Sequence, residues 1–322
     1  MKKLICIMLA ILLTIPLLAG CASSKKDGKI KIVCTMFPQY DWVKNILGDS
    51  RSVELSLIIG NGTDPHSYQP TTADIMSVSN CDMIVRIGSD SETWINEAIE
   101  RAQNTSLKNI ELASIEGMTL HDISSSSHEH DEHEHMHGSF DEHIWLSIKN
   151  AITAVEALTD EICKLDENNA DDYRKNAENY ILSLTNLDRE YRMAVNEIPF
   201  ANRFMLFADR FPFVYLLYDY GIEYQAAFDG CTTDVDADFD TVIKLVTAAD
   251  THEVSCIAIT ESSDGALAQT IVSSAKKTDI KIVVMNSLQR VSQKDAESGV
   301  SYLGIMEENL SVLKTALGAK GE

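Results

Sequence analysis

The sequence lacks the motifs that mark several common classes of protein. Its seven cysteines include no CxxC pair. Scattered cysteines predict neither a disulfide framework nor a thiolate zinc site. The sequence also has no G-x-S-x-G elbow, no phosphate-binding P-loop and no G-x-G-x-x-G after a strand-like run. These absences exclude the enzymes that such motifs identify, and we expect a protein without catalytic residues.

Basic charge is also scarce. The 322 residues carry 27 Lys and Arg against 49 Asp and Glu, which gives a formal net charge of −22. Nucleic acids and anionic membrane surfaces demand positive charge, so neither is an expected partner. An acidic surface attracts cations instead. We expect a monomer.

Long apolar runs are absent except at the N-terminus. Lys2 and Lys3 precede the apolar run Leu4–Leu18, which is shorter than the roughly 20 residues of a spanning helix. The layout predicts a secretory signal peptide over residues 1–20. Because Leu18-Ala19-Gly20-Cys21 resembles a bacterial lipobox, we expect Cys21 to carry lipid at the cell membrane, outside the cytoplasm, with residues 21–28 as a flexible tether. The alternative is an ordinary signal peptide followed by an incidental cysteine.

Strand-like and helix-like segments alternate from Lys29 onward, which predicts parallel βαβ units. We therefore expect an α/β protein of two lobes, each with a parallel sheet flanked by helices, joined by one long rigid helix. The expected N-terminal lobe covers residues 29–165, the connecting segment 166–198 and the C-terminal lobe 199–322. The connecting helix is predicted from about Ala170 to Asn196, and a closing helix from about Ala296 to Leu317.

Two histidines stand in segments that can hold them rigidly. His66 follows the predicted strand Val53–Ile59, between Pro65 and Pro70. Ligands collect at the carboxyl ends of parallel strands. His143 directly precedes the apolar Ile-Trp-Leu segment, where a carboxylate or backbone group could orient its ring, as metal-binding histidines require. We predict both as metal ligands. The alternatives are an ordinary surface histidine for His66 and, for His143, the last member of a histidine-rich tract.

That tract lies within a predicted loop, residues 121–140, and alternates histidine with Asp and Glu. Such runs attract zinc, copper or nickel weakly and in several ways. We expect a disordered loop that attracts metal through His128, His130, His133, His135 and His137. The tract contains an H-E-x-x-H match, but no apolar face is present to bury it as a zinc-protease helix, so we reject that interpretation.

The order of these features resembles the metal-binding lipoproteins of zinc and manganese ABC importers, over essentially the whole chain after the signal peptide. The most specific parts are Asp64-Pro65-His66 and Glu142-His143-Ile144-Trp145. The resemblance implies two pseudo-symmetric lobes with a metal in the cleft. It also implies delivery to a membrane permease powered by a cytoplasmic ATPase. His66 and His143 match the first two ligands of that family.

The C-terminal lobe departs from the family pattern. The third ligand position falls on Arg210, which has no lone pair to give, and the fourth falls on Asn286. Asp209 and Glu261 are the predicted replacements. Asp209 could instead pair with Arg210 or cap a helix. Glu261 could instead be a structural carboxylate, or could support one of the histidines. A histidine of the tract could also complete the site.

Three functions are compatible with these residues. The predicted one is an extracytoplasmic high-affinity zinc-binding protein that delivers the metal to an ABC permease. The alternatives are a metal-buffering or adhesin-like surface lipoprotein, and a zinc hydrolase with Glu261 as general base. Two imidazoles and the histidine tract favour zinc over manganese, because manganese prefers oxygen-rich sites.

Overall fold

The computed structural model describes residues 28–122, 140–228 and 237–319. Cys21, Cys231 and the histidines from His128 to His137 therefore lie outside the described residues. Within those ranges no helix is long and apolar enough to cross a membrane. The described cysteines Cys34, Cys81, Cys163 and Cys256 are free thiols and are buried.

The N-terminal lobe contains a four-stranded parallel sheet, as predicted. Its order is β2-β1-β3-β4. The strands are β1 (Ile30–Cys34), β2 (Val53–Leu57), β3 (Met83–Arg86) and β4 (Lys108–Glu111), and the helices are α2 (Phe37–Leu47), α3 (Thr72–Ser79) and α4 (Trp94–Glu100). β2 lies on one side of β1, and the chain then crosses to form β3 on the other side. Such a reversal of strand order places a crevice at the carboxyl ends of the strands.

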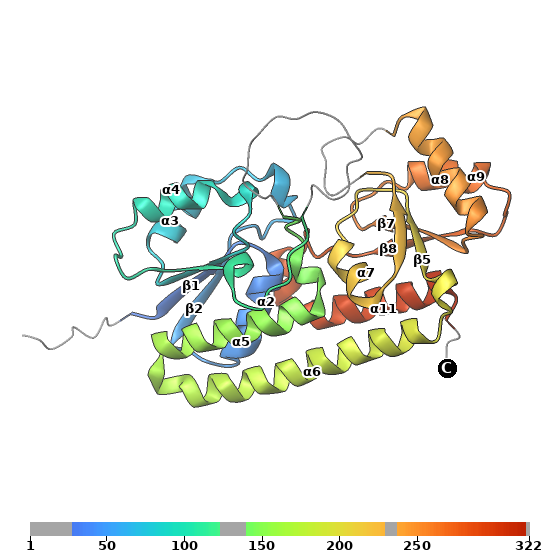
Figure 1. Ribbon diagram of the computed structural model, residues 1–322. Coiled ribbons are helices and arrows are strands. Elements are labelled where there is room, and N and C mark those ends of the chain that lie inside the picture. The colour runs from blue at the N-terminus through green and yellow to red at the C-terminus, as the bar shows by residue number, and fades with distance from the viewer. Residues whose placement is uncertain (1–27, 123–139, 229–236, 320–322) are drawn as a thin grey trace, which may run out of the picture.

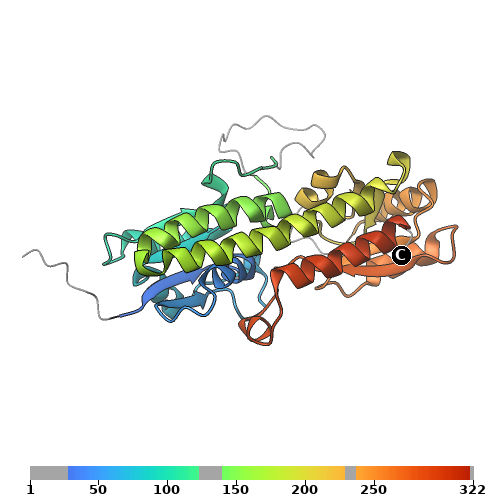
Figure 2. The same ribbon diagram turned by 90° about the horizontal axis from the view of Figure 1, so that it is seen from below.

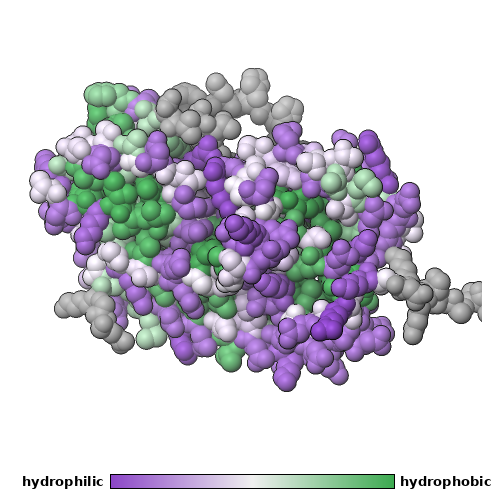
Figure 3. Space-filling view, turned by 180° about the vertical axis from the view of Figure 1, so that it is seen from behind, coloured by the Kyte–Doolittle hydropathy of each residue, from purple (hydrophilic) through white to green (hydrophobic). Residues whose placement is uncertain are grey.

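The C-terminal lobe repeats this topology with the order β6-β5-β7-β8. Its elements are β5 (Phe204–Phe207), α7 (Val214–Tyr220), β6 (Glu223–Ala226), α8 (Phe239–Thr251), β7 (Cys256–Thr260), α9 (Ala266–Ser274) and β8 (Lys281–Met285). The two sheets lie at opposite ends of the molecule (Figure 1). Seen from behind, hydrophobic side chains gather over each lobe with hydrophilic ones between them (Figure 3). Val284 on the edge strand β8 is half exposed.

A long helix runs beneath both lobes. α5 (Ile148–Leu165) leads through a tight turn into α6 (Ala170–Asn196), which packs against α2, α5, α7 and α11. Its buried side chains recur every three or four residues, at Tyr173, Ala177, Tyr180, Leu184, Leu187 and Tyr191, so they form one apolar stripe. A helix of 27 residues is about 40 Å long, enough to span both lobes. Figures 1 and 2 show α5 and α11 each lying alongside α6.

The predicted closing helix is interrupted. The structure has α10 (Gln293–Glu297) and α11 (Tyr302–Leu317) in place of one helix from Ala296 to Leu317. Gly299 between them has a φ of +104°, outside the helical region, so the α-helical hydrogen bonds stop there. Ser301 then caps α11 by accepting the backbone N–H of Gly304.

The lobes share one apolar interior. A single core cluster joins α2, α5, α6 and α11 to buried side chains of both sheets. Trp42 of α2 meets Tyr302 of α11 edge to face, with ring centroids 5.4 Å apart. Tyr302 donates its hydroxyl to the carbonyl oxygen of Trp145, at 2.7 Å. One continuous hydrophobic core therefore supports the loops at the inner edges of the two sheets.

Candidate metal centre

A short helical turn after β2 holds His66. Asp64 precedes the turn Pro65–Ser67, and its Oδ1 accepts the backbone N–H of His66 at 3.0 Å. Pro65 is buried and starts the turn with a fixed φ. The imidazole is about one-fifth exposed. The two-proline loop therefore positions His66 at the edge of the sheet, as the sequence predicts.

His143 begins the turn Ile144–Leu146 just before α5, and its side chain is almost fully buried. Its backbone N–H and its Nδ1 both lie 2.9 Å from Oδ1 of Asp141. The ring of Trp145 packs against it edge to face at 5.2 Å. Tyr215 of the other lobe donates its hydroxyl to the Asp141 carbonyl at 2.6 Å, which fixes the same segment from the far side.

In both imidazoles, the Nδ1 atom contacts a carboxylate oxygen. His66 Nδ1 lies 2.6 Å from Oε1 of Glu142, and His143 Nδ1 lies 2.9 Å from Oδ1 of Asp141. A carboxylate beside Nδ1 favours the tautomer that carries its proton there, so each Nε2 keeps a lone pair. The ring centroids are 5.6 Å apart. Imidazoles oriented by carboxylates at Nδ1 are the arrangement found in zinc sites.

Glu142 is an anion at neutral pH. Burial alone raises its pKa, but the hydrogen bond with His66 and the attraction of His66 and His143 lower the pKa to about 2. Ser91 also donates its hydroxyl to this carboxylate. The negative charge behind His66 makes its Nε2 a better electron donor.

A residue that the sequence analysis did not select connects the two histidines. The Nε2 atom of Gln289 lies 3.1 Å from His66 Nε2 and 2.8 Å from His143 Nε2. An amide nitrogen has two hydrogens, so it can donate to both lone pairs at once. Gln289 lies in the loop after β8, at the carboxyl end of a parallel strand. That position was the only signal in the sequence, because a neutral glutamine does not stand out as a ligand.

Arg210 forms an ion pair with Asp64, in the loop that carries His66. Its Nη1 lies 2.9 Å from Oδ2 of Asp64, and Nη2 of Arg290 lies 3.7 Å from the same oxygen. Asn286, at the other departure from the family pattern, accepts the backbone N–H of Leu288 on its Oδ1 at 2.8 Å.

The predicted replacements Asp209 and Glu261 both follow strand ends, and their carboxylates accept hydrogen bonds there. Oδ2 of Asp209 accepts the backbone N–H and the hydroxyl of Thr260, and its Oδ1 accepts the backbone N–H of Arg210. Glu261 accepts the backbone N–H of Ser287 at 2.9 Å and its hydroxyl at 2.6 Å. Their role as ligands stays a prediction. In the part of the chain described, no three His, Cys, Asp or Glu side chains form a metal-binding group.

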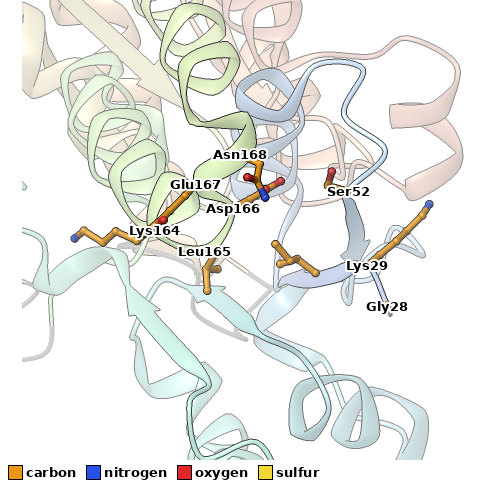
Figure 4. A pocket seen from close by; sticks show the side chains of 9 residues that line it. Gly28, Lys29, Ser52, Lys164, Leu165, Asp166, Glu167 and Asn168 are labelled. Atoms are coloured by element: carbon orange, nitrogen blue, oxygen red, sulfur yellow. The ribbon is translucent and has the colours of Figure 1, made fainter. Parts of the chain in front are cut away.

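A surface pocket of about 630 Å³ lies elsewhere, at the turn between α5 and α6 (Figure 4). Its wall includes Lys29, Ser52 and Asp166. None of the predicted ligands lines it. It sits at the start of the described chain, at Gly28, where the predicted tether would end.

Comparison with known proteins gives a consistent result. The family model described as zinc-uptake complex component A, periplasmic, matches residues 32–316. The zinc-binding lipoprotein AdcA of Streptococcus pneumoniae is 30% identical over 323 residues, with 100% of this chain and 62% of AdcA covered. The zinc uptake protein ZnuA of Bacillus subtilis is 32% identical over 303 residues, with 94% and 91% covered. This chain thus spans about three-fifths of the length of AdcA.

The fold matches as well. The crystal structure of the Zn(II)-bound ZnuA-like domain of Streptococcus pneumoniae AdcA has a TM-score of 0.71 to this chain at 27% identity. The match covers 90% of this chain and 99% of that domain. The predicted α/β architecture of two parallel sheets with a long connecting helix is therefore confirmed.

Proposed function

The chain belongs to the family of zinc-uptake complex component A, and we propose that it binds zinc outside the cytoplasm and delivers it to an ABC permease. The role is one of binding and transfer without turnover, as expected for a solute-binding protein. The permease and its ATPase are proposed partners.

The paired histidines carry this proposal. Carboxylates hold the Nδ1 atoms of both His66 and His143, and one amide nitrogen lies within 3.1 Å of both Nε2 atoms. Two lone pairs therefore converge on a small region between the lobes. We propose His66 and His143 as ligands, with Asp209 and Glu261 as further candidates in the C-terminal lobe.

Zinc is the proposed metal because the two strongest donors are imidazole nitrogens. Imidazole suits zinc, whereas manganese prefers sites made mostly of oxygen. The histidine tract between residues 128 and 137 is proposed to attract the metal and raise its local concentration. Attachment through lipid on Cys21 would keep the two lobes close to the permease.

A calorimetric titration of zinc separates the cleft from the tract. Asp122 and Phe140 form an antiparallel bridge, so residues 123–139 can be replaced by a short glycine linker without moving the ends. We expect the shortened chain to bind one zinc tightly and to lose this binding on His66→Ala. Loss of tight binding on shortening alone would contradict the proposal and favour a metal buffer whose sites lie in the tract.

Zinc uptake by cells tests the transport role. A strain without this chain should take up less radioactive zinc at low external zinc, and the gene for the shortened chain should restore uptake while His66→Ala should not. Normal uptake in the deletion strain would indicate the buffering or adhesin-like alternative. Loss of the chain from the membrane fraction on Cys21→Ala would support the lipid anchor.

A further inference from the structure

We infer that Tyr215 and Asp219, two residues of α7 in the C-terminal lobe, position His143 for zinc by holding the two ends of the segment Asp141–Ser147. The inference rests on the proposed zinc site of His66 and His143. Both α7 residues are positioning residues: each acts through the segment and not as a ligand.

The first anchor is the hydroxyl of Tyr215, a side chain that is almost fully buried. It accepts the backbone N–H of His121 at 3.2 Å and donates to the carbonyl oxygen of Asp141 at 2.6 Å. Because a tyrosine has one hydroxyl hydrogen, these two bonds fix its direction. Asp141 is also the residue whose Oδ1 lies 2.9 Å from His143 Nδ1. Tyr215 therefore holds the backbone that carries the partner of the imidazole.

The second anchor is the carboxylate of Asp219, at the start of α5. Its Oδ2 accepts the hydroxyl of Ser147 at 2.6 Å, and its Oδ1 lies 2.7 Å from Nζ of Lys149. Ser147 is the N-cap of α5 and accepts the backbone N–H of Asn150 on its Oγ at 3.1 Å. The positive end of the helix dipole also favours a carboxylate at this place. Because the Asp219 side chain is only 7% exposed, solvent screens these interactions weakly.

A single helical turn connects Ser147 to His143, so the second anchor reaches the histidine without a flexible link. The backbone N–H of Leu146 donates to the His143 carbonyl oxygen at 3.0 Å, and that of Ser147 donates to Ile144 at 3.3 Å. The three residues of the turn between them are buried. Close-packed interiors transmit displacement, so a shift of Ser147 would shift His143.

The two anchors lie on one face of one helix. Tyr215 and Asp219 are four residues apart in α7, which places their side chains one above the other. The middle of the segment is tied to the same lobe, because Trp145 donates its indole N–H to the carbonyl oxygen of Ser287. His66, by contrast, is carried by the loop after β2 of the N-terminal lobe. The spacing of the two histidines therefore depends on how α7 packs against the N-terminal lobe.

The first experiment measures zinc affinity by competition with a chelator, in the full-length chain in detergent and in the chain with residues 123–139 replaced. Tyr215→Phe removes only the hydroxyl, and Asp219→Asn removes only the charge. Each should weaken zinc binding about three- to tenfold, and the double variant at least about tenfold, which corresponds to the loss of one or two buried hydrogen bonds.

Matched control variants lie close by. Tyr220→Phe deletes a hydroxyl of the same helix that donates to Asp188 of α6 at 3.0 Å. Asp188→Asn alters a carboxylate that, like Asp219, contacts one cation and one hydroxyl, here those of Arg192 and Tyr220. Both controls should lower stability by a similar amount and leave zinc affinity unchanged. Equal zinc affinities in the test and control variants would overturn the inference.

The imidazole of His143 supplies a readout that a loss of stability alone would not move. In the metal-free chain with isotope-labelled histidine and residues 123–139 replaced, its Nδ1–H should give a resonance that exchanges slowly with water, because the ring is 2% exposed and Nδ1 contacts Asp141. Tyr215→Phe and Asp219→Asn should shift or broaden this resonance, whereas Tyr220→Phe should not. An unmoved resonance in both test variants would contradict the inference.

The two measurements also separate this inference from the proposed function. A wild-type chain that bound no zinc tightly would refute the proposed function. The resonance of the metal-free chain would still decide whether α7 positions the ring of His143.

Discussion

Arg210 in the C-terminal lobe places Nη1 2.9 Å from Oδ2 of Asp64, the residue whose other oxygen accepts the backbone N–H of His66. Arg210 therefore acts on the loop that carries His66 and not as a metal donor. Arg290 approaches the same carboxylate at 3.7 Å, so two cations from one lobe face one anion of the other. The ion pair joins the lobes beside the proposed metal.

Removal of that ion pair should weaken zinc binding. In Arg210→Ala the Asp64 loop loses its strongest inter-lobe contact, so we expect a several-fold lower zinc affinity. The loss of stability should be only about 1 kcal/mol, because both side chains are partly exposed to solvent. Chelator competition and urea unfolding measure the two effects.

The control for this substitution is Arg192→Ala. Arg192 pairs with Asp188 at 2.8 Å on the surface of α6, so its removal also deletes an Arg–Asp pair but not one at the cleft. Its zinc affinity should match wild type. Equal zinc affinities in the two variants would contradict a role for Arg210 at the site.

The orientation of His143 by Asp141 gives a second prediction. Asp141→Ala removes the acceptor of the His143 Nδ1–H and of its backbone N–H. Loss of such a partner typically lowers metal affinity by about 10–100-fold, and we expect this range for zinc. Glu116→Ala is the control, since Glu116 is an exposed carboxylate outside the site. An affinity within twofold of that control would show that the buried packing of His143 suffices.

The sequence predicted the regular parts of the fold closely. α6 has the predicted bounds, because its apolar side chains recur at helical spacing along the whole element. The prediction of one continuous closing helix was wrong at Gly299. The positive φ of this residue ends the helix, although the surrounding sequence has a helical pattern. In the C-terminal lobe, the resemblance led us to expect departures from the family pattern at Arg210 and Asn286, and these stay predictions.

The site was predicted only where its residues are unusual. Histidines held by prolines or by an apolar anchor stand out, so His66 and His143 were predicted as ligands, and the structure places their ring centroids 5.6 Å apart. Gln289 was missed because its significance lies in a contact across 223 and 146 residues of sequence, which no local pattern contains. The pairing of Glu261 with Ser287 is likewise a contact between neighbouring strand ends, visible only once the register of β7 and β8 is known.

Glu92 makes stability depend on pH. Burial raises the pKa of this carboxyl from 4.5 to about 7, despite hydrogen bonds from Thr35 and Gly88. The unfolded chain loses the proton near pH 4.5 and the folded chain near pH 7. The free energy of unfolding contributed by Glu92 is therefore greatest below pH 4.5 and falls as pH rises to 7, by about 3 kcal/mol.

Urea unfolding at several pH values, with metal removed by a chelator, measures this dependence. Glu92→Gln cannot ionise, so its stability should lose this fall between pH 4.5 and 7. Glu116→Gln, an exposed counterpart, should keep the wild-type slope. The same slope in Glu92→Gln as in wild type would assign the pH dependence to other groups.

Two buried tryptophans provide a matched test of the hydrogen bond that joins the lobes. Trp145 donates its indole N–H to the carbonyl oxygen of Ser287 at 2.9 Å, whereas the indole nitrogen of Trp42 has no hydrogen-bond partner among the described residues. Both side chains are 1% exposed, so substitution by phenylalanine removes similar packing. Trp145→Phe also leaves a buried carbonyl without this donor, and we expect it to cost about 1–3 kcal/mol more than Trp42→Phe. Because the ring of Trp145 also packs against that of His143, Trp145→Phe should in addition weaken zinc binding while Trp42→Phe should not. Equal losses of stability and of zinc affinity in the two variants would show that the hydrogen bond between Trp145 and Ser287 contributes to neither.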